Sequence, residues 1–316
     1  MPTMPLSNEE LLDALNTVIS IPPIPFTAEG AIDYEGHGKN IDYLLASNHL
    51  EGDRRRALCI AGTSLIHHIA IDDQLRLMEF TTDRMAGKGI FISGVAPNPL
   101  ADAERLIEAQ THFTHPPDCF LLMPLSGVAD PDGMYHSYMS LGERLGPAGV
   151  RFLYYLRQER ETETAVRLVN DSSQFLGVKA GTVPDDVKGI VDHIRPGAGT
   201  VIWGVGDRST APAAIGAKGH TSGINIGFAK ASDLINNAQR RGDYDESNRI
   251  EALIAPLEEI RFRNARQYNY SAVVEALHLG GWDDVEGGTG GPFNPRVPEA
   301  VREEVRAAIE PILSYH

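Results

Sequence analysis

A lysine closes a short apolar segment in the middle of the chain. Lys179 ends the run "QFLGVKAG" (174–181), whose Phe175, Leu176 and Val178 are typical of a buried strand. Bringing an ammonium group close to an apolar interior costs free energy, so burial lowers the pKa of a lysine. A neutral amine attacks the carbonyl carbon of a ketone and forms a Schiff base. The protonated imine then draws electrons from the adjacent carbon, so Lys179 predicts bond-making or bond-breaking chemistry there.

Other polar residues end neighbouring apolar segments. A tyrosine hydroxyl can carry protons, and hydroxyl and backbone N–H groups can hold a carboxylate, although Thr63 and Ser64 could instead cap the following helix. The planar fork of Arg157 suits a distal carboxylate, and an exposed ion pair is an equally good interpretation. The predicted site comprises Lys179 and Tyr154 for catalysis and Thr63, Ser64, Gly206, Ser222 and Arg157 for substrate binding.

Eight apolar segments of strand length alternate with segments of helical periodicity. This alternation predicts parallel strands joined by helical crossovers, and eight units predict a (β/α)8 barrel. The main alternative is a doubly wound open sheet, which would favour a glycine-rich dinucleotide turn after an early strand; the sequence has none. The predicted strands lie within residues 17–26, 57–64, 89–96, 118–124, 150–156, 174–181, 200–206 and 219–227.

Two parts of the chain lie outside this alternation. Ser7 and Glu10 form a capping-box pattern that predicts a short N-terminal helix. We therefore expect residues 1–228 to form the barrel with this helix, and residues 229–316 to form a helical C-terminal extension. In the extension the pattern predicts two helices broken near Gly242, a third over 270–281 and a fourth over 297–313.

The barrel model predicts how the candidate residues meet. Active sites of such barrels lie at the carboxyl ends of the strands. If Lys179 faces the barrel axis, period-two alternation places Gly177 and Phe175 on the same face. We then expect Tyr154 of the neighbouring strand to meet Lys179 at the mouth of the barrel, with Gly177 leaving room beside the lysine.

Composition excludes several kinds of partner. The 316 residues carry 43 acidic and 28 basic side chains, a formal net charge of −15, which makes nucleic acid an unsuitable partner. The apolar runs are shorter than the roughly 20 residues that a membrane-spanning helix needs. Cys59 and Cys119 both lie in apolar runs and are expected to be reduced core residues of a cytoplasmic protein. The chemistry predicted for Lys179 needs neither a cofactor nor a metal ion.

Several motifs together resemble one known family, the dihydrodipicolinate synthase/N-acetylneuraminate lyase family of class I Schiff-base lyases. They are "PIPFTAEGAID" (23–33), "GTS" (62–64), "FLYY" (152–155), "FLGVKAGT" (175–182), "GVGD" (204–207) and "KGHTSGINI" (218–226). The resemblance implies that Lys179 forms the imine and that Tyr154 is the catalytic tyrosine. It also implies a pyruvate-type 2-oxo acid substrate, no cofactor, C-terminal helices and a homo-oligomer, a dimer or a tetramer.

The sequence departs from that family at positions around the second substrate. "GTS" continues with Leu65 and Ile66 where the family has Gly-Glu, and Leu125 and Ser126 replace the tyrosine pair that ends the fourth strand. These departures favour aldol cleavage or condensation over dihydrodipicolinate synthesis itself. Two alternatives remain: dehydration of a 2-keto-3-deoxy sugar acid through the same imine, and a degenerate barrel that binds a keto acid without turnover. His67 and His68 come next in the sequence. They are interpreted either as ordinary loop residues or as residues that contact the distal end of a substrate.

Overall fold

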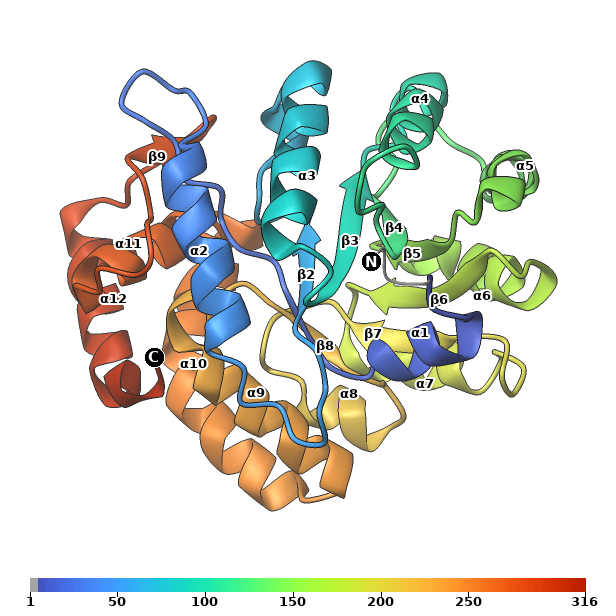
Figure 1. Ribbon diagram of the computed structural model, residues 1–316. Helices are drawn as coiled ribbons and strands as arrows, with labels where there is room; N and C mark the ends of the chain where they lie inside the picture. The colour runs from blue at the N-terminus through green and yellow to red at the C-terminus, as the bar shows by residue number, and fades with distance from the viewer. Residues whose placement is uncertain (1–4) are drawn as a thin grey trace.

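A closed barrel of eight parallel strands forms the centre of the molecule, and helices surround it (Figure 1). The computed structural model describes residues 5–316. Each strand pairs with the next along the chain, and the last pairs with the first, so the predicted barrel and its order are confirmed. The strands are β1 (Val18–Ser20), β2 (Ala57–Ile60), β3 (Ile90–Val95), β4 (Cys119–Leu122), β5 (Phe152–Leu156), β6 (Phe175–Ala180), β7 (Thr200–Trp203) and β8 (His220–Ser222).

One helix follows each strand, and the predicted N-terminal helix and C-terminal helices are both present. In helix α1 (Asn8–Ala14) the Ser7 hydroxyl accepts a hydrogen bond from the Glu10 N–H at 3.2 Å, which completes the expected capping box. The barrel helices are α2 (Tyr34–Ala46), α3 (Ile71–Met85), α4 (Leu100–Gln110), α5 (Pro131–Leu145), α6 (Thr162–Asp171), α7 (Pro184–Val191), α8 (Thr210–Ala214) and α9 (Asn225–Arg241).

The C-terminal helices are α10 (Tyr244–Arg266), α11 (Ser271–Gly280) and α12 (Glu299–Ile309). Helix α9 packs against β1 and β8, so it also serves as the eighth helix of the barrel. The expected boundary at residue 228 falls inside α9, which has a kink at Phe228 with non-helical angles of φ −139° and ψ 50°. A small hairpin of β9 (Gly290–Gly291) and β10 (Asn294–Pro295) separates α11 from α12.

Strand register decides which side chains face the barrel axis. Residues paired across neighbouring parallel strands point to the same face. Tyr155 pairs with Lys179, and Lys179 pairs with Ile202, so these three share one face. The same face carries Ile19, Cys59, Ile92, Leu121, Leu153 and Thr221 around the barrel.

A bulge in β6 overturns part of the predicted alternation. Phe152 pairs with Phe175, but the next residue of β5, Leu153, pairs with Gly177, so Leu176 is an extra residue. Phe175 therefore does not share the face of Lys179; its ring stacks on that of Phe152 at 5.1 Å, in the layer between strands and helices. Simple alternation fails here because the bulge shifts the phase by one residue.

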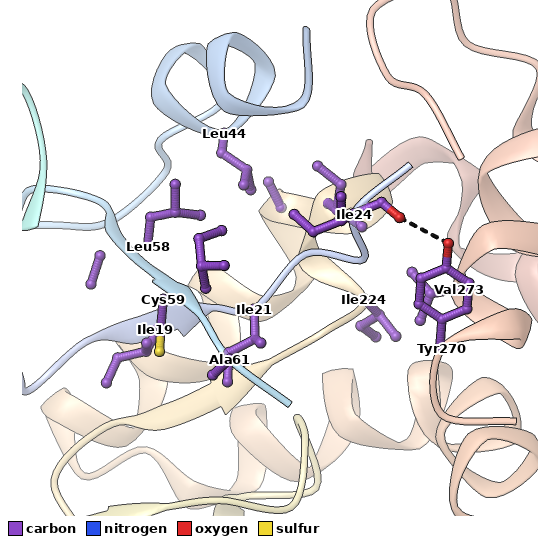
Figure 2. Packing of buried hydrophobic residues seen from close by; sticks show 14 of the residues in the cluster. Ile19, Ile21, Ile24, Leu44, Leu58, Cys59, Ala61, Ile224, Tyr270 and Val273 are labelled. Atoms are coloured by element: carbon purple, nitrogen blue, oxygen red, sulfur yellow. Dashed lines mark hydrogen bonds between the residues drawn. The ribbon is translucent and has the colours of Figure 1, made fainter. Parts of the chain in front are cut away.

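The C-terminal extension is anchored to the loop after β1. Tyr270 is buried, and its hydroxyl donates a hydrogen bond to the Ile24 carbonyl oxygen at 2.8 Å, beside Val273 of α11 (Figure 2). Burial raises the pKa of the Tyr270 hydroxyl, which keeps it protonated as a donor. This contact fixes the segment between α10 and α11 close to the carboxyl end of the barrel.

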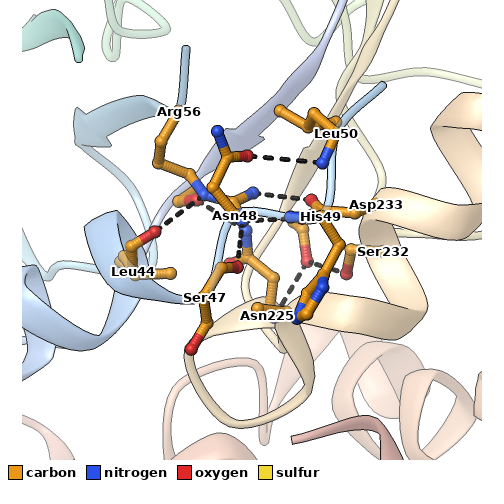
Figure 3. A network of polar contacts seen from close by, with 12 residues as sticks. Leu44, Ser47, Asn48, His49, Leu50, Arg56, Asn225, Ser232 and Asp233 are labelled. Carbon is orange, nitrogen blue, oxygen red and sulfur yellow. Dashed lines mark hydrogen bonds and ion pairs between the residues drawn. The ribbon is translucent and has the colours of Figure 1, made fainter. Parts of the chain in front are cut away.

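A buried ion pair joins β2, α2 and α9 (Figure 3). Arg56 donates two hydrogen bonds to the Asp233 carboxylate, at 2.6 and 2.7 Å, and both side chains are buried. The guanidinium also donates to the carbonyl oxygens of Leu44 and Ser47, and the His49 N–H donates to Asp233 at 2.8 Å. Hydrogen bonds thus compensate both charges for the loss of water.

Cys59 and Cys119 are buried free thiols, as expected. Burial raises the pKa of the Cys59 thiol to about 12, which makes it a poor nucleophile at neutral pH. Within residues 5–316, no helix is both long enough and apolar enough to span a bilayer.

Replacing Asp233 with alanine should lower the free energy of unfolding by about 3–5 kcal/mol, because the Arg56 charge would stay buried without a partner. Chemical denaturation followed by circular dichroism measures this. Asp42→Ala is the control, since Asp42 pairs with Arg84 at the surface and should contribute about 1 kcal/mol or less. Equal effects of the two substitutions would contradict the role of the buried pair.

Candidate active site

A cavity of about 480 Å³ opens at the carboxyl ends of the strands. It contains the predicted residues Lys179, Thr63, Arg157, Gly206 and Ser222, and it is where a barrel of this type has its active site. The remaining lining residues are Ile21, Gly62, His67, Met123, Pro124, Tyr155, Gln158, Gly204, Thr221, Gly223, Arg261, Phe262, Arg266 and Asn269.

Lys179 lies inside the barrel against the ring of Tyr155. Its Nζ atom is 4.0 Å from the ring centroid, and the side chain is only 4% exposed. Gly204, which directly follows β7, makes room for the lysine stem, since a Cβ atom there would lie 2.9 Å from Cγ of Lys179. The predicted space at Gly177 is absent, because a Cβ atom on Gly177 would lie 2.4 Å from the Thr200 carbonyl oxygen.

The pKa values of Lys179 and Tyr155 are both shifted toward neutral pH. Burial lowers the pKa of the Lys179 amine, and the neighbouring Tyr155 oxygen opposes that effect. Burial alone would raise the pKa of Tyr155, but nearby cations, Lys179 first, lower it to about 7. Tyr155 loses its proton most readily while Lys179 carries one, so the two groups are suited to exchanging a proton at neutral pH.

Two arginines surround the Tyr155 hydroxyl. Arg266 donates to the Tyr155 oxygen at 3.4 Å and to the Gly181 carbonyl oxygen at 3.2 Å. The guanidinium carbon of Arg157 lies 5.6 Å from the Tyr155 ring centroid. Gly181 allows this crowding, because a Cβ atom there would lie 2.5 Å from the Tyr155 ring and 2.8 Å from Arg157 Cδ.

The predicted meeting of Tyr154 with Lys179 is wrong, because Tyr154 points away from the barrel axis. Its hydroxyl donates to the buried Glu161 carboxylate at 3.0 Å, and its ring packs edge-on against Tyr138 of α5. Burial and then the Glu161 charge raise the pKa of Tyr154, so its proton is held firmly. The tyrosine beside the lysine is the next residue, Tyr155, in register with Lys179.

The strand-two motif contributes one residue to the cavity. Thr63 lines it, and its hydroxyl accepts a hydrogen bond from the Asn269 amide at 3.4 Å. Ser64 is not brought there: its hydroxyl donates to the Pro22 carbonyl oxygen at 2.7 Å, and its N–H donates to Ala61. Both groups of Ser64 therefore serve the turn after β2.

The other predicted binding residues line the cavity but offer few free polar groups to a substrate. Ser222 lines it, but its hydroxyl donates to the buried Asp207 carboxylate at 2.6 Å. Gly206 adopts φ +71°, and a Cβ atom there would overlap the Glu258 carboxylate. His67 also lines the cavity, as an exposed residue, whereas His68 packs against Phe293 with ring centroids 4.9 Å apart. Across residues 5–316, no group of three or more His, Cys, Asp and Glu side chains is placed to hold a metal ion.

The segment that closes the cavity from the C-terminal extension was not predicted from the sequence. Arg261, Phe262, Arg266 and Asn269 all come from the end of α10 and the turn before α11. The helical pattern breaks here, since residues 264–266 have φ values of 49°, 57° and 73°. Such a run of left-handed, non-glycine residues is strained and occurs mostly at functional sites. The available signal was the basic stretch "RFRNAR" (261–266) in an acidic chain.

Titration of the protein should show one tyrosine ionising near pH 7. The lowered pKa of Tyr155 predicts an early rise in tyrosinate absorbance, well below the ordinary range of the other tyrosines. Tyr155→Phe should remove this step, and Tyr154→Phe should retain it. A protein whose tyrosines all ionise near pH 10 or above would contradict this electrostatic picture.

Comparison with known proteins identifies relatives along almost the whole chain. A model of the dihydrodipicolinate synthetase family matches residues 14–311. The 4-hydroxy-tetrahydrodipicolinate synthase of Acidothermus cellulolyticus is 26% identical over 298 residues, which cover 89% of this chain and 86% of that protein. The enzyme of the same name from Pseudomonas putida (strain W619) is 24% identical over 247 residues, covering 76% and 81%.

Solved structures show the same fold at low sequence identity. Dihydrodipicolinate synthase from Bacillus clausii superimposes with a TM-score of 0.86 at 20% identity, covering 95% of this chain and 98% of that one. The enzyme from Acinetobacter baumannii, complexed with pyruvate, gives a TM-score of 0.81 at 20% identity, covering 96% and 100%. With the family model matching nearly the full length, the chain belongs to the dihydrodipicolinate synthetase family.

Proposed function

We propose that this protein is a cofactor-free class I lyase that forms a Schiff base between Lys179 and a 2-oxo acid. The observation that carries the proposal is the buried Lys179 amine in contact with Tyr155 inside the barrel-mouth cavity. Family membership supports it, since the family is one of class I aldolases and synthases. A solved relative is complexed with pyruvate, a 2-oxo acid, which supports that substrate class here.

The reaction begins with attack of the neutral Lys179 nitrogen on the substrate C2 atom. The carbonyl oxygen leaves as water, and the C=N bond forms. The protonated imine withdraws electrons from C3, so that the C3–C4 bond breaks or forms as in an aldol reaction. Tyr155, which ionises near neutral pH and lies against Lys179, carries protons between the nitrogen and the leaving or arriving oxygen.

The substrate carboxylate has a partner at the strand-two end of the cavity. We assign its binding to the Thr63 hydroxyl, which the Asn269 amide helps to orient. Both residues line the cavity.

Dehydration of a 2-keto-3-deoxy sugar acid is a second candidate, because the same imine also expels a hydroxyl group from the substrate. Among the described residues, Tyr155 is the one tyrosine that lines the cavity. Leu125, at the position of the family's relay tyrosine, packs in the layer outside the barrel. A single phenol suits aldol cleavage or dehydration better than the relay of dihydrodipicolinate synthesis. Product analysis separates the two candidates, since aldol cleavage releases two carbon fragments and dehydration keeps one skeleton.

Lys179→Ala should abolish covalent trapping of pyruvate by borohydride, because reduction fixes the imine as a stable amine. Intact-mass spectrometry of the treated protein measures the adduct. Lys188→Ala is the matched control: Lys188 lies at the surface paired with Asp192, and its loss should leave the adduct unchanged. An adduct that persists in Lys179→Ala would disprove the assignment, and an adduct without turnover of any 2-oxo acid would indicate a binding protein.

Tyr155→Phe should lower turnover by about 10²–10⁴-fold, the usual contribution of a general acid–base group, while leaving the imine competent to form. Tyr154→Phe should retain most of the activity, because that hydroxyl faces Glu161 outside the barrel. Steady-state kinetics of the two variants on the substrate found by product analysis tests this. The reverse ranking would return the catalytic role to Tyr154.

A further inference from the structure

The candidate cavity is cationic although the chain is acidic. Four basic side chains line it: Lys179, Arg157, Arg261 and Arg266, and no Asp or Glu is among its lining residues. The whole chain has a formal net charge of −15. A concave site of the opposite sign to the rest of the protein attracts and retains anions.

Of the three arginines, only Arg261 pairs with a carboxylate in the described part of the chain. Arg261 forms a buried ion pair with Glu258 and donates to the Asn269 amide oxygen at 2.8 Å. Arg157 and Arg266 form no ion pair with any residue in the described part of the chain. The hydrogen bonds of Arg266 go to the Tyr155 hydroxyl and the Gly181 carbonyl oxygen. Burial lowers the pKa of Arg266; the Tyr155 oxygen opposes this effect, and the charge of Arg157 adds to it. Neither guanidinium therefore has a carboxylate partner in the described part of the chain, which leaves both available to an anion in the cavity.

Backbone strain accompanies the position of Arg266. Residues 264–266 are left-handed, and Tyr270, four residues later, is fixed by its hydrogen bond to Ile24. Straight continuation of α10 would not produce this turn. Tyr155 touches both Lys179 and Arg266, so one aromatic ring separates the amine that captures C2 from the guanidinium. A short carbon chain spans such a gap.

We infer that Arg157 and Arg266 form a second anion subsite, and that the substrate is a 2-oxo acid with a further acidic group at its distal end. This inference rests on the proposed imine chemistry and adds the class of substrate: a diacid rather than a monoacid or neutral sugar chain. Arginine is suited to this task because its planar fork binds a carboxylate through two parallel hydrogen bonds.

A matched pair of probes tests the subsite. 2-Oxoglutarate and 2-oxopentanoate have equal chain length and the same carbonyl, and they differ in the distal carboxylate. Borohydride trapping, read by intact mass at fixed ionic strength, gives the concentration of each probe for half-maximal adduct. We expect wild type to need at least about tenfold less 2-oxoglutarate, the scale of one charge-assisted contact. The ratio of the two concentrations cancels any change in the reactivity of Lys179.

Arg266→Met and Arg157→Met should each reduce that ratio toward one. Arg263→Met is the control, because Arg263 comes from the same irregular segment but pairs with Glu304 and does not line the cavity. It should keep the wild-type ratio. The two test variants come from different elements, so failure of one to fold leaves the other informative.

Two results would overturn the subsite: a wild-type ratio near one, or a ratio that neither arginine substitution changes. An equal loss of trapping for pyruvate, 2-oxopentanoate and 2-oxoglutarate would assign the arginines to the C1 carboxylate and would also refute a distal subsite. If no probe forms an adduct, the proposed imine chemistry fails. Calorimetric binding of glutarate against pentanoate, neither of which has a ketone, then decides the subsite on its own.

Discussion

Burial of one amine against one aromatic ring is the constraint on which the site depends. Lys179 is buried inside a closed ring of strands, and its Nζ atom contacts the face of Tyr155. Low polarity weakens the hold of the nitrogen on its proton, while the positive surroundings weaken the hold of Tyr155 on its own. Burial causes the shift of Lys179, and the nearby cations, Lys179 first, cause the shift of Tyr155. Because the two groups are also in contact, the pair is suited to proton transfer.

The rest of the structure permits that contact or supplies its charges. Gly204 allows the lysine stem to pass along β7, and Gly181 allows Arg157 and Tyr155 to crowd together. The barrel alone leaves the mouth open, and the C-terminal extension adds the residues around it. The irregular end of α10 brings Arg266 into contact with Tyr155. The extension is therefore part of the site as well as part of the hydrophobic core.

The architecture was predictable because it rests on local patterns. Each of the eight apolar segments contains one strand, and the order of a βα repeat leaves few topologies. The position of Lys179 at the end of the sixth strand followed from the same pattern. The helices after β8 were also expected, since their apolar periodicity and the break at Gly242 are local patterns of consecutive residues.

The predictions that failed depended on relations between distant residues. Alternation along β5 correctly separated Tyr154 from Tyr155, but only the pairing with β6 shows that Tyr155 faces the axis. The bulge at Leu176 changes the phase within a single strand and has no clear local signal. Ser64 was expected in the cavity because nothing in its neighbourhood shows that Pro22 takes its hydroxyl.

The arginine segment was missed for the same reason. It joins the site from about 87 residues beyond Lys179, through packing that no short pattern encodes. The basic stretch is visible in the sequence, but the sequence does not show that it lies over the mouth of the barrel.

The most direct test of this account is the pKa of the Lys179 amine in the folded protein. Nuclear magnetic resonance of the protein with ¹³C-labelled lysine side chains follows each Cε signal with pH, and the Lys179→Ala variant identifies the relevant one. We expect this signal to titrate clearly below those of the surface lysines, because burial disfavours the charged amine. A Lys179 signal that titrates with or above the surface lysines would contradict it.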